Sequence, residues 1–396
     1  RVVDPSNDEG RSAHPVRFTP RRMHRAPLVA SKRDKINIFL LHWKESERML
    51  TRRDSTIDIA KGIAIIAIVF GHIHRGMWAS GLGTEAFRPY KYVLDYGVYF
   101  WHLVVFAFLS GLFVSRGALK TTPSSYLTKR LVLFGYLYVI WQVLQVGMKL
   151  VLPSNSSDKT TVMSLLELWK PEGQLWFFPW LMIVTIIAVV TRVWQKNAIA
   201  ALTIAGSAIL ALASWGYIGE YVGTQGLSLL FFFLVGVALG HERFQRIMSS
   251  IPLAAHAGIV AVGLFDYIYL LMNIQATPPT VIPYFTNDVG AVAMGILATV
   301  ISSLTVLSLS YLLARVPWSG WLAYLGRHSL EIFIAHIVCG AAFRFVLTKS
   351  GLFSVPLFLV GGTIFAILAS LLLGYCARKL RIPLFTLPRP IEQKIS

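Results

Sequence analysis

Apolar runs of about 20 residues recur from residue 57 almost to the C-terminus, and these runs decide the fold class. A helix of that length is what crossing the hydrocarbon core of a bilayer requires. Of the 396 residues, 55% are hydrophobic and only 14% are charged, which excludes an ordinary soluble domain. Since helices satisfy their backbone hydrogen bonds internally, the sequence predicts an all-α, polytopic membrane helical bundle in contact with membrane lipids.

The runs predict about ten transmembrane helices, of which the sixth is short and the ninth carries charges. Their approximate bounds are 57–79, 93–115, 131–152, 174–193, 197–215, 226–240, 251–272, 288–313, 320–343 and 353–376. Three parts follow: a basic, largely disordered cytoplasmic tail at 1–56 with an interfacial helix at 36–43, a transmembrane domain at 57–376, and a cytoplasmic tail at 377–396.

Positive residues are concentrated in the two tails and in alternate loops. The formal net charge of +18 is typical of nucleic-acid-binding proteins, but here its distribution follows the positive-inside rule, so no nucleic-acid partner is expected. The rule predicts a plasma (inner) membrane protein with both termini cytoplasmic. The connections at 153–173 and 273–287 are then the longest on the outer side.

The first predicted span, DIAKGIAIIAIVFGH, carries two groups that are costly in lipid. Lys61 and His72 are 11 residues apart, which places them on nearly the same helix face, roughly 16 Å from each other along the axis. Lysine and histidine at such depths usually mark a functional site or a water-filled cavity. Alternatively, Lys61 extends to the inner interface beside Asp58, and His72 is a packing residue. Gly62 and Gly71 would let a helix or a ligand approach closely.

Two further histidines lie inside predicted spans. His102 is near the middle of the second span, where it either shares a cavity with His72 or hydrogen-bonds to a backbone carbonyl. In the ninth span, LGRHSLEIFIAH, Glu331 and His336 point about 140° apart around the helix. Arg327 is four residues before Glu331, so we expect these two to form an ion pair and His336 to face elsewhere.

The sequence predicts no metal site. His72 and His74 are two residues apart and therefore lie on different faces of a helix, and the chain has no HExxH motif and no closely spaced cysteine pair. Nucleophile-elbow and Walker motifs are also missing. Any chemistry is therefore expected within the helical bundle.

Five segments resemble, in the same order, those of the integral-membrane acyltransferase family 3, and most of all its fucose 4-O-acetylase-like branch. They are DIAKGIAIIAIVFGH, WHLVVFAFLSG, SYLTKRLVLFGYLYVIW, GQLWFFPWL and LGRHSLEIFIAH, and the resemblance covers about residues 54–376. Lys61 stands where the family often has arginine, so the charge is kept and the bidentate fork is lost. Leu-Val follows His102 where Met-Pro is common in the family.

The resemblance implies an O-acyltransferase. It would move an acyl group, with acetyl expected, from cytoplasmic acetyl-CoA or another acyl-CoA to a hydroxyl of a sugar, a glycan or a lipid-linked glycan. His72 would be the general base or, alternatively, the carrier of a transient acyl group. His102 would orient the base or stabilise the oxyanion, and Lys61 would bind negative groups of the donor.

Other residues are candidates for binding the substrate or the donor. Arg116, Lys129 and Arg130 lie on the predicted inner side, where they would meet the phosphates of CoA, although topology alone also explains them. Gln174 and Trp176 begin the fourth span on the outer side, and they suit hydrogen bonding and stacking to a sugar, or an interfacial position. The remaining candidates in the quoted motifs are Asp58, Glu331 and His336.

A second class of function uses the same residues. A transporter or flippase would use Lys61, His72 and His102 as a path for protons or substrate. Internal repeats would support that class, and none is evident in the sequence.

Overall fold

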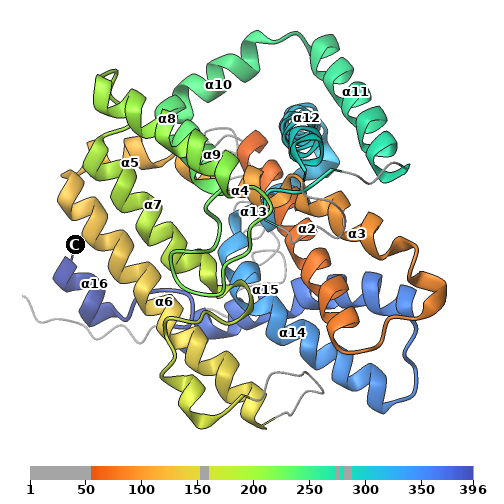
Figure 1. Ribbon diagram of the computed structural model, residues 1–396. Coiled ribbons are helices and arrows are strands. Elements are labelled where there is room, and N and C mark those ends of the chain that lie inside the picture. The colour runs from red at the N-terminus through yellow and green to blue at the C-terminus, as the bar shows by residue number, and fades with distance from the viewer. Residues whose placement is uncertain (1–54, 152–159, 273–275, 281–287, 396) are drawn as a thin grey trace, which may run out of the picture. The chain divides into compact units, whose positions relative to one another are not determined.

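The computed structural model describes residues 55–151, 160–272, 276–280 and 288–395, and within them every regular element is a helix, as predicted. Figure 1 shows these helices packed as a bundle. The interfacial helix predicted at 36–43 lies outside the described residues.

Eight helical segments in the described residues are long and apolar enough to cross a membrane. They are Ser55–Ala79 (α2), Tyr90–Lys120 (α3 to α5), Pro123–Leu150 in α6 (Pro123–Val151), Gly173–Thr191 (η3 and α7), Leu253–Leu270 in α11 (Leu253–Met272), Val289–Leu313 (α12), Ser329–Lys349 (α14) and Leu357–Leu380 (η5 and α15). The fifth and sixth predicted spans are shorter apolar helices, α8 (Ala198–Ala213) and α9 (Leu229–Leu239). The amphipathic α10 (His241–Ser250) follows α9, and α16 (Arg389–Ile395) ends the described chain.

The second span is three helices rather than one: α3 (Tyr90–Tyr99), α4 (His102–Gly111) and α5 (Val114–Lys120). The first break falls at Trp101, whose φ of −130° departs from helical geometry. The carbonyl of Val98 there meets the side chain of His102 as well as a backbone N–H. The break therefore places His102 at the first position of α4, with its ring directed back towards α3.

The ninth predicted span also differs from a single helix. A short helix, α13 (Gly320–Arg327), ends at His328, and α14 begins at Ser329. This break separates the inner part of the LGRHSLEIFIAH motif from the part that carries His336.

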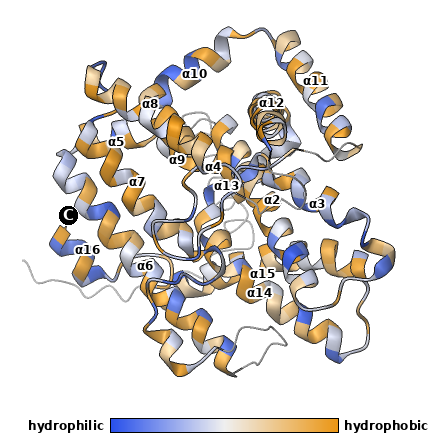
Figure 2. Ribbon diagram, viewed as in Figure 1, coloured by the Kyte–Doolittle hydropathy of each residue, from blue (hydrophilic) through white to orange (hydrophobic). Residues whose placement is uncertain are grey.

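Helix α2 occupies the core of the bundle. It contacts α3, α4, α12, α13, α14 and α15, and most of its residues are buried. By contrast, α11 exposes most of its apolar side chains, as expected of a helix that faces lipid. Figure 2 shows how hydrophobic and hydrophilic residues are distributed along these helices. The side chains of α2 therefore face protein, which removes the lipid contact that would make a charged residue there costly.

Two glycines let α2 and α13 touch backbone to backbone. A Cβ atom on Gly62 would overlap the carbonyl of Leu322, and one on Gly326 would overlap the carbonyl of Asp58. The expectation that Gly62 admits a neighbouring helix is thus confirmed. The space beside Gly71 is filled by α3, because a Cβ on Gly71 would lie 3.1 Å from the ring of Tyr99.

Candidate active site

Two histidines from different helices meet in the core. The rings of His72 (α2) and His336 (α14) have their centroids 5.1 Å apart. Their side chains differ in access: His336 is 0% exposed, whereas His72 is partly exposed. No described residue hydrogen-bonds to the ring of His72, so the described part of the chain does not fix its tautomer.

Backbone carbonyls fix the tautomer of His336. Its Nδ1 lies 3.0 Å from the carbonyl oxygen of Ile332 and 2.9 Å from that of Phe333. Because a carbonyl only accepts hydrogen bonds, Nδ1 carries the proton and donates it. The Nε2 atom of His336 then presents a lone pair, and it is buried with no hydrogen-bond partner.

His102 is held in the same way. Its Nδ1 lies 2.5 Å from the carbonyl of Val98, so the proton is on Nδ1 and the lone pair is on Nε2. The ring is buried and packs edge-on against Tyr99, with 4.5 Å between centroids. His102 also lies within electrostatic reach of His72, as do Arg75 and Asp95.

A buried ion pair supports Tyr99. Both carboxylate oxygens of Asp95 accept hydrogen bonds from Arg75, at 2.7 Å from Nε and 2.9 Å from Nη2. Asp95 is 0% exposed, and the guanidinium carbon of Arg75 lies 3.5 Å from the centroid of the Tyr99 ring. The guanidinium therefore packs on the face of the ring whose neighbour is His102. Sequence reasoning missed this pair, although Arg75 and Asp95 are ionisable residues within the first and second predicted spans, which is the signal that selected His72.

Lys61 lies near the other end of α2 and is partly buried. Its Nζ atom is 5.0 Å from the centroid of the Phe113 ring, and that ring lies 5.0 Å from the ring of His241, the first residue of α10. Lys61 thus faces the protein at the start of α10 rather than lipid alone. Asp58, which we expected beside Lys61, also has a basic neighbour on α13: Nη1 of Arg327 lies 3.8 Å from its Oδ2.

The expected Arg327–Glu331 ion pair is wrong. Glu331 instead pairs with Arg378 of α15, and Nδ1 of His328 lies 3.4 Å from its Oε2. The spacing of four residues brings two side chains together only on a continuous helix, and the helix stops between these two. Glu331 faces α15 while His336 faces α2, as their separation around the helix predicted.

Gln174 is bonded to the backbone of α14, whereas Trp176 belongs to an aromatic cluster. The Nε2 of Gln174 donates a hydrogen bond of 2.8 Å to the carbonyl of Ile334. Ile334 and His336 belong to the same turn of α14. Trp176 packs against Phe177 and Trp180. The structure therefore places Gln174 against α14, the helix that carries His336, and Trp176 among the aromatic side chains of α7.

The basic donor-binding candidates lie elsewhere. Arg116 and Arg130 are exposed on α5 and α6, and Lys129 is partly exposed. The guanidinium of Arg130 lies 5.4 Å from the ring of Tyr126. These residues line neither the histidine pair nor the pocket described next.

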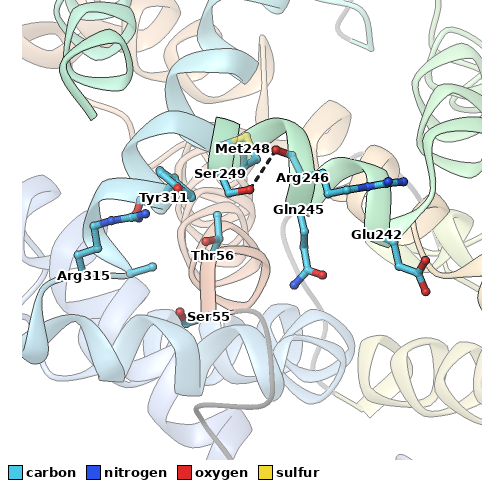
Figure 3. Close-up of a pocket in the computed structure, with 10 residues that line it drawn as sticks. Ser55, Thr56, Glu242, Gln245, Arg246, Met248, Ser249, Tyr311 and Arg315 are labelled. Carbon is cyan, nitrogen blue, oxygen red and sulfur yellow. Dashed lines mark hydrogen bonds between the residues drawn. The ribbon is translucent and has the colours of Figure 1, made fainter. Parts of the chain in front are cut away.

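A pocket of about 800 Å³ lies where the start of α2, the amphipathic α10 and the end of α12 meet (Figure 3). Arg315 and Tyr311 are on one side of it, and the residues of α10 are on the other. The Nη1 of Arg315 donates a hydrogen bond of 2.6 Å to the carbonyl of Tyr311. The lining residues are Ser55, Thr56, Glu242, Gln245, Arg246, Met248, Ser249, Tyr311, Ala314 and Arg315. Among the described residues, no cluster of three or more His, Cys, Asp or Glu is placed to hold a metal ion.

The described residues thus form an all-helical bundle with helices long and apolar enough to cross a membrane, and His72 and His336 meet in its core. The family model of the acyltransferase domain of acyltransferase family 3 matches residues 54–375, which is most of the chain. The chain therefore belongs to this family and is a membrane acyltransferase, as the resemblance of its five segments implied. Comparison with curated proteins and with solved structures finds no match.

Proposed function

We propose that this acyltransferase transfers an acetyl group from acetyl-CoA on the cytoplasmic side to a hydroxyl of a sugar or glycan on the outer side, as the fucose 4-O-acetylase-like branch implies. The observation that carries the proposal is the partly exposed ring of His72 beside the buried His336 in a chain of this family. Transfer to an alcohol requires a base for the hydroxyl proton, and imidazole is the side chain best suited to that task near neutral pH.

In the proposed reaction, His72 acts first as a base and then as an acid. His72 takes the proton of the acceptor hydroxyl while the hydroxyl oxygen attacks the thioester carbonyl carbon. The tetrahedral intermediate then collapses, the carbon–sulfur bond breaks, and the CoA thiolate leaves with the proton that His72 returns. In the alternative route, a ring nitrogen of His72 attacks the thioester carbonyl, the carbon–sulfur bond breaks, and the CoA thiolate leaves with the proton that the acylated ring gives up. The acceptor hydroxyl then attacks the acetyl carbon, the carbon–nitrogen bond breaks, and the released imidazole takes the hydroxyl proton.

The tautomer of His102 limits which role it can have in the reaction. With Nδ1–H on the carbonyl of Val98, neutral His102 presents a lone pair and has no proton on Nε2 to donate to an oxyanion. This geometry favours an orienting role for His102. Arg75 is a cation within electrostatic reach of His72, and it is suited to stabilising the negative charge of the intermediate.

The donor would bind at the predicted inner end of α2. The pocket beside Arg246 and Arg315 has the volume of a ligand site, and its arginines suit phosphate groups. Lys61 lies between this end and His72, which is roughly 16 Å further along the same helix. A long thioester arm extending along α2 would therefore keep the nucleotide on the inner side while its acyl group reaches the histidine.

Radiolabelled acetyl-CoA and the purified protein test the proposal. His72→Ala should lower the rate of label transfer about 10²- to 10⁴-fold, because a general base contributes about that much. His328→Ala is the matched control, because His328 faces Glu331 at the helix break, and this variant should transfer label normally. Transfer at the wild-type rate by a well-folded His72→Ala protein would refute the assignment, and a transporter would transfer no label at all.

Two substitutions locate the donor. Replacing Arg246 and Arg315 together with alanine should raise the KM for acetyl-CoA and leave kcat largely unchanged, because the loss concerns binding that the ground state and the transition state share. Replacing Arg116 and Arg130 together is the comparison. A KM that responds only to the second pair would move the donor to α5 and α6.

Mass spectrometry of cell-surface glycans, with and without the protein, identifies the acceptor. A mass difference equal to one acetyl group, lost in His72→Ala cells, is the expected result. The proposed location is the plasma (inner) membrane, with both termini in the cytoplasm.

A further inference from the structure

Three polar atoms on or near one turn of α14 are buried and have no hydrogen-bond partner among the described residues. They are Oε1 of Gln174, Nε2 of Gln145 and Nε2 of His336. The side chains of Gln174 and Gln145 are 1% and 5% exposed, and His336 is fully buried. Leaving a buried polar group unpaired costs about 1–3 kcal/mol, so three of them on one turn point to a ligand that pairs with them.

Contacts of Gln174 and of its neighbour Gly173 place the two glutamines beside the same turn of α14. Gln174 is tied to the carbonyl of Ile334, two residues before His336. A Cβ atom on the neighbouring Gly173 would lie 2.9 Å from Cδ1 of Ile337 and 3.7 Å from Oε1 of Gln145. Gly173 has a φ of +50°, which favours glycine, and a side chain here would press on Ile337 beside the two amides.

Gln142 shows what a structural glutamine looks like on the same helix. Its Nε2 donates to the carbonyl of Lys170 and its Oε1 accepts from the backbone N–H of Glu172, so both of its polar ends are used. Gln145 is three residues later on α6 and has no hydrogen bond to any described residue. Gln142 therefore holds the loop before η3 in place, whereas the buried amide nitrogen of Gln145 remains able to bond to a ligand.

We infer that Gln145 and Gln174 form a subsite for the acceptor and that this subsite takes a neutral, polyhydroxylated sugar ring. The inference rests on the proposed function. One amide N–H and two acceptors, the Gln174 oxygen and the His336 lone pair, match hydroxyl groups, which both donate and accept. Lys149 is four residues after Gln145 and Glu172 is two residues before Gln174, and these two charged residues pair with each other. The groups of the subsite are two neutral amides and, with its proton on Nδ1, a neutral imidazole, so they offer no charge that would select a uronic acid or a phosphorylated sugar.

Acceptor competition tests the neutral character. Purified protein and labelled acetyl-CoA are supplied with the methyl glycosides of glucose, galactose, mannose and fucose, with methyl glucuronoside and galacturonoside, and with 1-butanol. At least one neutral glycoside should accept label with saturable kinetics, at least tenfold better than 1-butanol or the uronosides. If no neutral glycoside exceeds 1-butanol, the inference is overturned.

Gln145→Leu tests the subsite itself. It should raise the KM for the preferred glycoside roughly 3- to 10-fold, the effect of one hydrogen bond, and leave the slow hydrolysis of acetyl-CoA by water unchanged. Because Gln145 has an unpaired amide, this variant should unfold at the same temperature as wild type or higher. Gln142→Leu, the matched control, should unfold at a lower temperature.

The outcomes separate this inference from the proposed function. Hydrolysis that depends on His72, together with a glycoside KM that Gln145→Leu does not change, would overturn only the subsite. A lower unfolding temperature for Gln145→Leu with an unchanged KM would show that ordered water pairs with these atoms, which also overturns it. No hydrolysis and no transfer in wild type would instead reject the proposed function.

Discussion

The buried ion pair of Arg75 and Asp95 gives the sharpest prediction about stability. Asp95→Ala removes two charge-assisted hydrogen bonds and leaves a guanidinium in the core without its carboxylate. Breaking a buried pair from one side typically costs about 3–5 kcal/mol, and the lower end applies because the Arg75 side chain is 30% exposed. We therefore expect a loss of about 3 kcal/mol in the free energy of unfolding.

The double variant Arg75→Met, Asp95→Leu separates stability from function. Replacing both charges with apolar groups should recover most of the lost free energy, since neither charge then remains buried alone. Acetyl transfer should stay impaired, because Tyr99 has lost the guanidinium that packs on its ring beside His102.

The assay is reversible unfolding of the purified protein by SDS in mixed micelles, followed by tryptophan fluorescence. Glu85→Gln, at the exposed Glu85–Arg88 pair, is the control and should leave the unfolding free energy unchanged. A loss of less than about 1 kcal/mol for Asp95→Ala would refute the reasoning, because the pair would then behave like one at the surface. Full activity of the double variant would show that the pair does not position the site.

Three further predictions follow from the helices. Gly326→Ala should lower the free energy of unfolding by about 1–3 kcal/mol because the added methyl group meets a backbone carbonyl. Gly147→Ala, with open space around it, should not lower it, and equal effects of the two variants would contradict the close crossing of α2 and α13. Lys61→Ala should strongly lower acetyl transfer and Lys61→Arg should retain much of it, while full activity of the alanine variant would indicate an interfacial lysine. A reporter enzyme active only outside the cytoplasm should be silent after Ser396 and active within 273–287, and the reverse result would invert the orientation.

The sequence predicted the helices well because the length of an apolar run directly reflects the thickness of a bilayer. It did not predict the breaks at Trp101 and His328, because neither position has a proline or a glycine that marks an interruption. The missed break at His328 explains the wrong ion pair, since the spacing between Arg327 and Glu331 was interpreted on a continuous helix. Local spacing is informative only while the backbone keeps its period.

The candidate site was predicted in part. Depth and helical face selected His72 and His336 separately, and the structure brings their rings together. Neither the partner of Asp95 nor the surroundings of Gln145 follows from one sequence, because each depends on how distant helices pack. The inner pocket was missed for the same reason, since its lining comes from segments more than 250 residues apart.

Helix α2 runs without interruption from Ser55 to Ala79, unlike the second and ninth predicted spans. The position of Lys61 relative to His72 is therefore set by the number of residues between them. One inserted residue would turn His72 by about 100° away from His336, whereas four would return it to within about 40° and move it about 6 Å further from Lys61. Tolerance to insertions in this segment should thus rise and fall with the helical repeat, and on the proposed path of the donor along α2 this helix would set the length of the acyl-donor arm.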